Sequence, residues 1–214
     1  YIEDNFINNS DIYNKNILDY CCGTGSYSII PAQNGANVWG VDISSKSIEL
    51  AIERSKILNT SKKCKFEVGD AEKLSFDDNF FDVILCYGSL SYLDLNKSFQ
   101  ELKRVLRPEG KIILVDSLGY NPLINYNRKR NITNYASNYV NQLRTITHKD
   151  LKISLKYFDS YSIHYFDFFT LLGKLLSSKF KINIDANKLA SIDSYFLKLP
   201  LVKRLSFKFV CVLS

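Results

Sequence analysis

The stretch that decides the fold is ILDYCCGTGSYSI, residues 17–29. Its apolar start predicts a buried strand, and a glycine-containing turn then leads into a helix that we expect over residues 26–34. Gly23 and Gly25 permit backbone angles that other residues rarely adopt, and they let a ligand approach the main chain closely. The segment therefore predicts a strand, a ligand-binding turn and a helix in succession.

The first 117 residues continue this alternation of apolar runs and helical patterns. Near-continuous apolar strands that alternate with helices indicate a parallel sheet covered by helices on both faces. Ligands of such sheets bind at the carboxyl ends of the strands. We expect strands at residues 16–21, 36–43, 64–69, 80–87 and 110–116, and helices at residues 26–34, 44–59 and 95–106, the last closed by a turn at 107–110.

The second half of the chain has a different character. Residues 118–214 carry 15 basic and 5 acidic residues, whereas the first 117 carry 13 and 17. Residues 121–141 are rich in Asn, Tyr and Arg and predict a long loop or irregular helices. Beyond this stretch we expect a strand at 160–169, helices at 168–179 and 186–199, and a final strand at 205–213.

The composition is that of a globular protein, with 46% hydrophobic and 23% charged residues. No apolar run is long enough for a membrane span and no signal peptide is visible, so we expect a cytoplasmic protein. The five cysteines lack the spacing of zinc ligands, which predicts buried thiols and no metal site. Because the chain begins at Tyr1 and contains no Met, we expect residues to be missing from its N-terminus or interior.

Acidic residues follow two neighbouring strands of the expected sheet. Asp42 ends the second strand, where a carboxylate suits the hydroxyl groups of a ribose, and Asp70 ends the third, where it suits an exocyclic amine such as that of adenine. Together with the glycine turn, these acids predict a nucleoside pocket. A nicotinamide dinucleotide site is the rival interpretation, but Ser28 stands where its GxGxxG pattern needs the third glycine.

From residue 16 to residue 116 the chain resembles the class I S-adenosylmethionine (SAM)-dependent methyltransferases. DYCCGTG is similar to their first motif, VDIS to the second and GDAEKLSF to the third. FDVILCYGSL and ELKRVLRPEGKIILVD resemble the fourth and fifth. These motifs resemble those of the methyltransferase type 11 branch of the family, which includes quinone-biosynthesis methyltransferases.

The resemblance implies an α/β fold with a Rossmann-like, seven-stranded, mostly parallel sheet, helices on both faces and an antiparallel last strand. It also implies one domain over residues 1–214. In that domain, residues 1–117 would form the SAM-binding core, residues 118–204 a substrate-facing cap, and residues 205–214 the final strand.

The resemblance further implies SAM as the cofactor, with S-adenosylhomocysteine as its product. Cys21 stands where the family usually has Gly. Around the methionine end of SAM we expect four residues, Asp19, Cys21, Gly23 and Gly25. Asp42 would hold the ribose and Ile43 would lie against the adenine. Asp70 and Ala71 would meet the edge of the adenine, and Tyr87 would lie near the reacting methyl group.

Methyl transfer from a sulfonium is an in-line displacement that depends mainly on alignment of the reactants and exclusion of water. A general base is needed only for a poorly acidic hydroxyl or a protonated amine. We expect His148, Asp116 and Tyr120 as the catalytic candidates, and His164 as a structural residue. The segment 117–130 resembles an acceptor-facing stretch of some family members, so we also expect Asn121, Asn125 and Arg128 at the pocket.

We predict methyl transfer to a small molecule, first to the oxygen of a sugar-containing, natural-product or quinone-like acceptor. The alternatives are an RNA methyltransferase, for which the basic second half is the only indication, and a non-catalytic SAM-binding subunit. No Asn/Asp-Pro-Pro-aromatic element is present, and Cys86 has no preceding Pro, which argues against two classes of base methyltransferase. Residues 166–176 have an amphipathic pattern that allows contact with a membrane surface.

Overall fold

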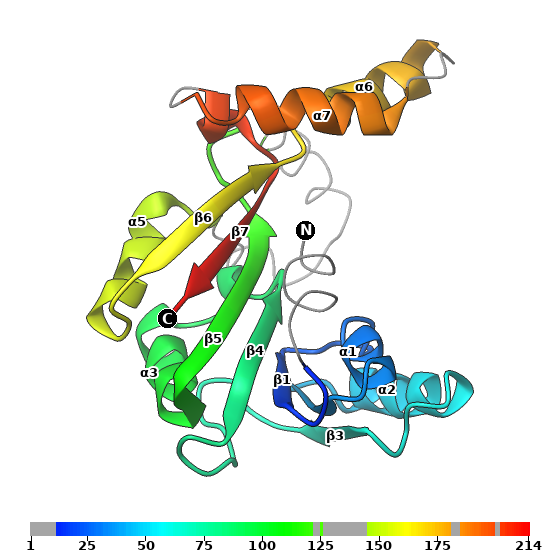
Figure 1. Ribbon diagram of the computed structural model, residues 1–214, viewed down its shortest axis with the longest axis vertical. Helices are drawn as coiled ribbons and strands as arrows, with labels where there is room; N and C mark the ends of the chain where they lie inside the picture. Colours follow the sequence, from blue (N-terminus) through cyan, green and yellow to red (C-terminus); the bar gives the residue numbers. More distant parts are fainter. Residues whose placement is uncertain (1–11, 122–124, 126–144, 181–184, 200–201) are drawn as a thin grey trace.

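The computed structural model describes residues 12–121, 125, 145–180, 185–199 and 202–214 (Figure 1). Its seven strands form one sheet in the order β3-β2-β1-β4-β5-β7-β6. The strands from β1 to β5 pair in parallel, and β7 runs antiparallel to both of its neighbours. The predicted Rossmann-like sheet with an antiparallel last strand is therefore confirmed.

The strands lie close to the predicted positions. They are β1 (Asn16–Tyr20), β2 (Asn37–Asp42), β3 (Cys64–Val68), β4 (Phe81–Tyr87), β5 (Leu106–Ser117), β6 (Tyr161–Phe166) and β7 (Lys208–Leu213). The helices are α1 (Ile29–Gln33), α2 (Ser45–Ile57), α3 (Leu95–Val105), α5 (His148–Leu151), α6 (Phe169–Phe180) and α7 (Ala186–Phe196), and the short 3₁₀ helices are η2 (Leu90–Tyr92), η4 (Lys152–Lys156) and η5 (Val202–Leu205).

The core consists of two apolar layers, one on each face of the sheet. One layer joins inward-facing residues of the central strands to α3, through side chains such as Phe99 and Leu102, and to Leu151 of α5. The other layer lies on the face covered by α1, where Ala32 packs with Val38 and Ile113. Figure 1 shows α1 and α2 on one side of the sheet and α3 and α5 on the other.

The helix after the glycine turn is shorter than predicted. It begins at Ile29 rather than at residue 26, because Gly25 and Ser28 donate their amides to Cys22 and Gly25 in successive turns, at 2.9 and 3.2 Å. Pro31 lies within the first turn of α1. Its missing N–H costs no helical hydrogen bond there, since the first amides of a helix have no intrahelical partner.

Helix α2 starts as predicted, with the Ser44 hydroxyl accepting the Ser47 amide at 3.2 Å. Its inward face is narrower than the pattern indicated. Residues Ile48, Ala51 and Ser55 are buried, but Ile52 and Leu58 are 36% and 42% exposed. The helical spacing places Ile52 and Leu58 on the same face as these three residues, but α2 covers only part of that face against β2 and β3.

The predicted turn at residues 107–110 is also wrong. Helix α3 ends at Val105, and β5 begins at the next residue. The register of β4 and β5 passes from Phe81–Leu106 to Val83–Lys111, so the extra residues of β5 form a bulge. In place of the predicted turn, Pro108 lies in an irregular part of one long strand.

Helices α6 and α7 form a pair that crosses the end of the sheet beyond β6 (Figure 1). Asp193 of α7 joins them, since its carboxylate accepts the amides of Phe168, Phe169 and Thr170 and the Thr170 hydroxyl, at 2.7–3.2 Å. A carboxylate at these amides complements the positive end of the α6 dipole. Among the described helices, none is long and apolar enough to cross a membrane. The stretch 121–141 lies almost entirely outside the described residues.

Candidate functional site

The glycine turn between β1 and α1 adopts left-handed backbone angles, with φ of +51° at Gly23 and +70° at Gly25. The two glycines have different surroundings. A Cβ atom on Gly25 would lie 2.9 Å from the Ala51 Cβ and 3.0 Å from the Phe66 ring, so Gly25 lets the turn pack against α2 and β3. A Cβ atom on Gly23 would meet no atom within 4 Å. Gly23 therefore presents bare main chain to an open side.

Cys21 also has a left-handed conformation, with φ of +57°. This is the residue that stands where the resembled family has Gly, and the positive φ explains that preference. The thiol is partly exposed and packs against the core on the α3 face. Burial, followed by the charges of Asp42, Asp19 and Asp70, raises the pKa of the Cys21 thiol to about 12. The side chain is therefore a neutral thiol at physiological pH, beside the turn.

Asp42 at the end of β2 links the glycine turn to α2. One carboxylate oxygen accepts the Gly23 amide at 2.8 Å, and the other accepts the Ser44 amide at 2.9 Å. Each oxygen keeps a further lone pair, because a carboxylate oxygen can accept two hydrogen bonds. The next residue, Ile43, is 79% exposed and presents apolar surface beside the carboxylate. The carboxyl edge of β1 and β2 thus combines bare main chain, an acceptor and an apolar surface.

Asp19 in β1 lies beneath the turn and is 2% exposed. The Ser28 hydroxyl donates a hydrogen bond to its Oδ2 at 2.5 Å. Burial raises the pKa of Asp19 to about 6, the Ser28 bond opposes this rise, and the charge of Asp42 adds to it. The charge of Asp42 therefore disfavours ionisation of Asp19, and a cationic ligand near the turn would offset that repulsion.

Asp70 and Ala71 follow β3 as predicted, but they differ in exposure. Asp70 is exposed, and its carboxylate accepts the Glu72 amide at 2.8 Å. Ala71 is 8% exposed, and its carbonyl accepts the Tyr20 hydroxyl at 2.8 Å. The Tyr20 bond fixes this segment to the end of β1, so Asp70 stands at the same edge of the sheet as Asp42.

Tyr87 ends β4 and contacts two residues that the sequence analysis did not single out. Tyr27 from the glycine turn stacks on its ring, with centroids 3.9 Å apart. The Lys208 ammonium of β7 donates to the Tyr87 hydroxyl at 2.9 Å. Burial favours the neutral phenol, but the hydrogen bonds from Lys208 and Tyr27 and the charge of Lys208 outweigh it and lower the pKa of Tyr87. The end of β4 is therefore an aromatic and cationic surface.

The three predicted catalytic residues lie around the ends of β5 and α5. Asp116 is 7% exposed, and its Oδ1 accepts the amide of the next residue at 2.6 Å. Tyr120 stacks on the His148 imidazole, with ring centroids 5.3 Å apart. The His148 Nε2 forms a 2.8 Å hydrogen bond with the Tyr165 hydroxyl of β6. Asp116 and Tyr165 share a register row across β5, β7 and β6, so their side chains project on the same face of the sheet.

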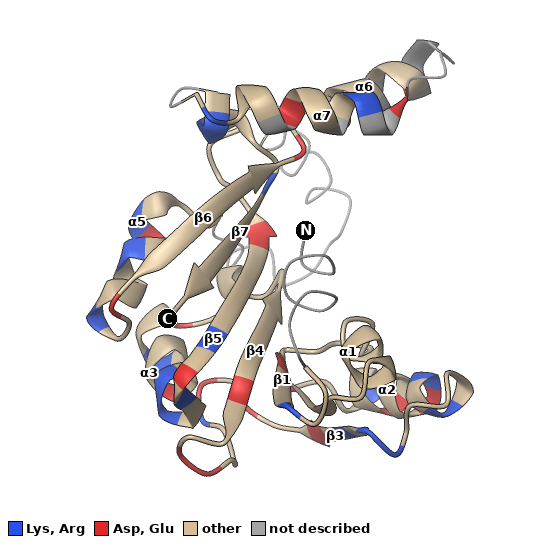
Figure 2. Ribbon diagram, viewed as in Figure 1, with Lys and Arg blue, Asp and Glu red and all other residues tan. Residues whose placement is uncertain are grey.

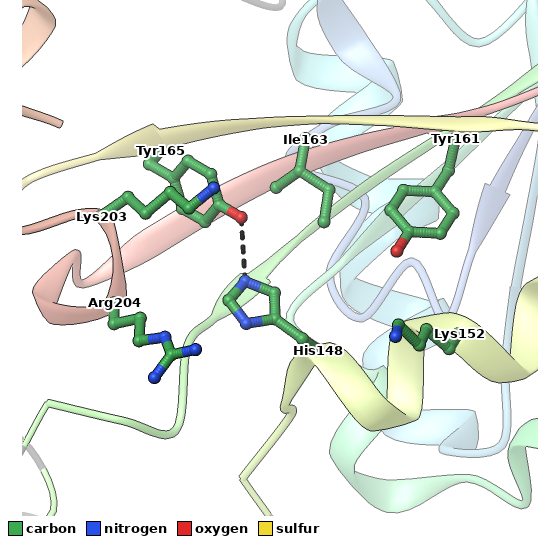
Figure 3. Close-up of a pocket in the computed structure, with 7 residues that line it drawn as sticks. All are labelled: His148, Lys152, Tyr161, Ile163, Tyr165, Lys203 and Arg204. Atoms are coloured by element: carbon green, nitrogen blue, oxygen red, sulfur yellow. Dashed lines mark hydrogen bonds between the residues drawn. The ribbon is translucent and has the colours of Figure 1, made fainter. Parts of the chain in front are cut away.

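A cavity of about 500 Å³ adjoins His148 on this face (Figure 3). Its lining residues come from α5, η4, β6 and η5, and most are basic or aromatic. They are His148, Lys152, Tyr161, Ile163, Tyr165, Lys203 and Arg204. The sequence analysis identified only His148 among them, because the others come from segments whose spacing carries no motif. The excess of basic residues in the second half of the chain was the only sequence signal for these lining residues.

The other predicted pocket residues are only partly described. Asn121 donates to the Leu205 carbonyl at 2.5 Å and Asn125 to the Gly119 carbonyl at 2.7 Å, so both fasten the segment after β5. Arg128 lies outside the described residues. His164 lies on β6 and pairs with Val210 of β7. Within the part of the chain that the structure describes, no three His, Cys, Asp or Glu side chains gather to hold a metal ion.

Comparison with known proteins agrees with this geometry. Residues 18–114 match the methyltransferase domain family. The chain is 36% identical over 109 residues to a sterol 4-C-methyltransferase of Caenorhabditis elegans, covering 50% of this chain and 33% of that protein. It is 36% identical over 112 residues to the demethylmenaquinone methyltransferase of Lactobacillus johnsonii, covering 50% and 46%. The chain thus matches between a third and a half of the length of these relatives.

A solved structure from Pyrococcus horikoshii has the same fold. It superimposes with a TM-score of 0.67 at 20% sequence identity, covering 100% of this chain and 87% of that one. This likeness extends over the whole chain, whereas each of the two sequence relatives matches half of it. It shows the fold alone.

Residues 18–114 therefore form a methyltransferase domain of the class I, SAM-dependent type. Within that class, the relatives place the domain in the branch that includes the quinone-biosynthesis methyltransferases. The predicted family and the predicted cofactor, SAM, are confirmed at this level. The residues also fit this cofactor physically, since SAM carries a sulfonium and an ammonium group. The Gly23 amide is bonded to the Asp42 carboxylate, and the buried Asp19 carboxyl is close enough to Asp42 for their charges to interact, so this edge favours a cation.

Replacement of Cys21 tests the left-handed conformation of the turn. We expect Cys21→Val to lower the free energy of unfolding by about 1–3 kcal/mol, because a β-branched residue is strained at positive φ. Cys21→Gly should change it by less than about 1 kcal/mol, because relief of backbone strain offsets the lost side-chain contacts. Urea denaturation of both variants measures the difference. Equal destabilisation by Val and Gly would contradict the assigned conformation.

The raised pKa of Asp19 predicts a specific pH dependence of stability. Between about pH 4 and pH 6 the folded protein holds a proton at Asp19 that the unfolded chain has released, so stability falls as the pH rises. Asp19→Asn should remove this slope, on the order of 2 kcal/mol across that range. Urea denaturation at several pH values without cofactor measures it. The exposed Asp77→Asn serves as the control, and an equal change of slope in both variants would refute the assignment.

Proposed function

We propose that this protein transfers the methyl group of SAM to a small-molecule acceptor. The observation that carries the proposal is the anionic edge of the sheet at β1 and β2. There, the open main chain of Gly23 is bonded to the Asp42 carboxylate, and the charge of Asp42 acts on the buried Asp19. A cationic cofactor is attracted to such a site, because its charge offsets the repulsion between the two carboxyl groups.

In this proposal Asp42 binds the ribose through the lone pairs that the Gly23 and Ser44 amides leave free. The exposed Ile43 side chain supports the adenine, and Asp70 with Ala71 borders its edge. Asp19, Cys21 and Gly25 shape the methionine end. When bound, SAM supplies an electrophilic methyl group, and the protein aligns the acceptor with it and excludes water.

We further propose the end of β5 as the source of any general base. Asp116 is the first residue to test, because it lies beside the end of β4, where Tyr87 stands. The His148 Nε2 is bonded to the Tyr165 hydroxyl, so only the Nδ1 of His148 can exchange a proton with an acceptor while that bond persists. Burial and three neighbouring cations lower the pKa of His148, which keeps its imidazole neutral at physiological pH. Tyr120, stacked on His148, would orient the acceptor.

The acceptor is proposed to be a ring-containing metabolite, with oxygen or carbon as the acceptor atom. The aromatic surface of Tyr27 and Tyr87 suits a flat ring at the end of β4. The names of two relatives, a sterol 4-C-methyltransferase and a demethylmenaquinone methyltransferase, support ring acceptors and carbon as an acceptor atom alongside oxygen. Sugar-containing and natural-product acceptors remain in the proposal.

Replacement of Asp42 tests the cofactor site. We expect Asp42→Ala to weaken SAM binding by on the order of 1–3 kcal/mol, about tenfold to a hundredfold, through loss of charge-assisted hydrogen bonds. Asp42→Asn should have an intermediate effect, because its carbonyl keeps one acceptor for the Gly23 amide. Calorimetric titration with SAM measures the affinity, and thermal denaturation checks the fold. The exposed Asp77→Ala is the control, and unchanged affinity in Asp42→Ala would refute the ribose role.

Turnover with a panel of acceptors tests the activity itself. The full chain is incubated with ¹³C-methyl SAM and with hydroquinones, sterols, phenolic glycosides and bulk RNA in separate reactions. We expect methylated product from at least one small molecule, and the carbon chemical shift distinguishes an O-methyl from a C-methyl group. Tight SAM binding without any product would instead indicate a binding subunit, and product from RNA alone would contradict the small-molecule acceptor.

A further inference from the structure

The cavity beside β6 has a chemical character of its own. It is bounded on one side by β6 and on the other by α5 and η4, with η5 closing one end (Figure 3). Tyr161, Ile163 and Tyr165 occupy alternate positions of β6, so all three side chains project from one face of the strand. They form an apolar and aromatic wall, and a volume of about 500 Å³ is large enough for a small molecule.

Three cations reach this cavity from two separate segments, Lys152 from η4 and Lys203 with Arg204 from η5. None of the seven lining residues is acidic. In the described part of the chain, none of these three cations forms an ion pair with a carboxylate. Figure 2 shows basic residues on α5 and on the turn before β7. Like charges that converge without a counter-charge repel each other, and an anion between them would offset that repulsion.

Two contacts hold the polar groups of the cavity in position. The Lys203 ammonium lies 5.7 Å from the centroid of the Tyr165 ring, within the range of a cation–π interaction. The Tyr165 hydroxyl in turn bonds the His148 Nε2 at 2.8 Å. Part of the cationic surface is therefore preorganised rather than mobile in solvent, which lowers the entropic cost of binding.

We propose that this cavity binds a phosphorylated small molecule, with the phosphate at Lys203, Arg204 and Lys152 and the ring of the ligand on the β6 wall. A phosphate monoester carries close to two negative charges at neutral pH and several acceptor oxygens, which suits three converging cations better than a single carboxylate does. The Arg204 guanidinium adds a planar pair of donors that matches two phosphate oxygens.

This site is separate from the cofactor cradle. The cradle lies at the ends of β1, β2 and β4, and the cavity lies along β6, at the far edge of the sheet beyond β5 and β7. The inference therefore does not rest on the proposed methyl transfer. Binding to the cavity should persist in Asp42→Ala, in which the cofactor site is impaired.

Phenyl phosphate is the probe for the first test, with inorganic phosphate and phenol as its two halves. Calorimetric titration of the full chain should show saturable binding of phenyl phosphate, and both halves should bind at least about tenfold more weakly. Equal affinity for inorganic phosphate and phenyl phosphate would overturn the role of the β6 wall. Absence of saturable phenyl phosphate binding would overturn the site.

The second test removes the cations. Lys203→Gln/Arg204→Gln should weaken phenyl phosphate binding at least about tenfold, since charge-assisted bonds are lost. The control is Lys56→Gln/Lys62→Gln, which makes the same change of charge at exposed positions on α2 and after it. Equal weakening in both would show nonspecific attraction and overturn the site. Lys152→Gln gives an independent single replacement if the double variant unfolds.

The imidazole of His148 provides a readout inside the cavity. Lys152, Lys203 and Arg204 face it, together with the Tyr120 and Tyr165 rings. After burial, these three cations are the causes that lower the pKa of His148. A bound phosphate should raise that pKa, as followed by NMR titration with and without phenyl phosphate, with His148→Gln assigning the signal against His164. An unchanged His148 pKa at saturating probe would place the phosphate elsewhere and overturn the proposal.

Discussion

The structure of the cofactor edge depends on one carboxylate. Asp42 accepts the amide of Gly23 with one oxygen and the amide of Ser44 with the other, and so fixes the turn after β1 to the start of α2. A backbone hydrogen bond reinforces this link one residue before Gly23, where the Cys22 amide donates to the Val41 carbonyl of β2 at 2.9 Å. The carboxylate and the backbone hold the turn together, and Gly23 keeps its open side.

A second acid, Asp19, lies close to the same turn. Asp19 is buried, bonded to Ser28, and close enough to Asp42 that the charge of Asp42 adds to the raised pKa of Asp19. A buried carboxyl group beside another acid is unfavourable when it is ionised, because burial and the neighbouring charge both oppose its charge. A bound cation would offset this unfavourable interaction. This is the form of preorganisation expected at a binding site.

Most of the sheet could be predicted from the sequence because local patterns decide it. Buried parallel strands are continuous apolar runs, and Phe81–Tyr87 and Asn16–Tyr20 are such runs. The glycine turn and Asp42 could be predicted as well, because their spacing follows from the strand–turn–helix geometry of this fold. Prediction failed where tertiary contacts decide the outcome. Ile52 and Leu58 are exposed because α2 packs on outer strands, and the bulge around Pro108 depends on pairing with β4.

The residues that line the cavity beside β6 could not be predicted from the sequence for the same reason. Lys203 is distant in the chain from Lys152 and Tyr165, and it reaches the cavity because η5 directly precedes β7, which pairs with β6. No motif records such a meeting, so only the excess of basic residues after residue 117 pointed toward it.

The position of β7 between β5 and β6 has a consequence for how the chain is made. Residues 208–213 leave the ribosome after β6, yet β6 joins the sheet only through them. Until they emerge, β5 displays an unpaired row of amides and carbonyls, which can recruit strands from other nascent chains. The sheet is thus complete only after β7 is synthesised, and polypeptides that stop short of this segment are natural clients for chaperones and proteases.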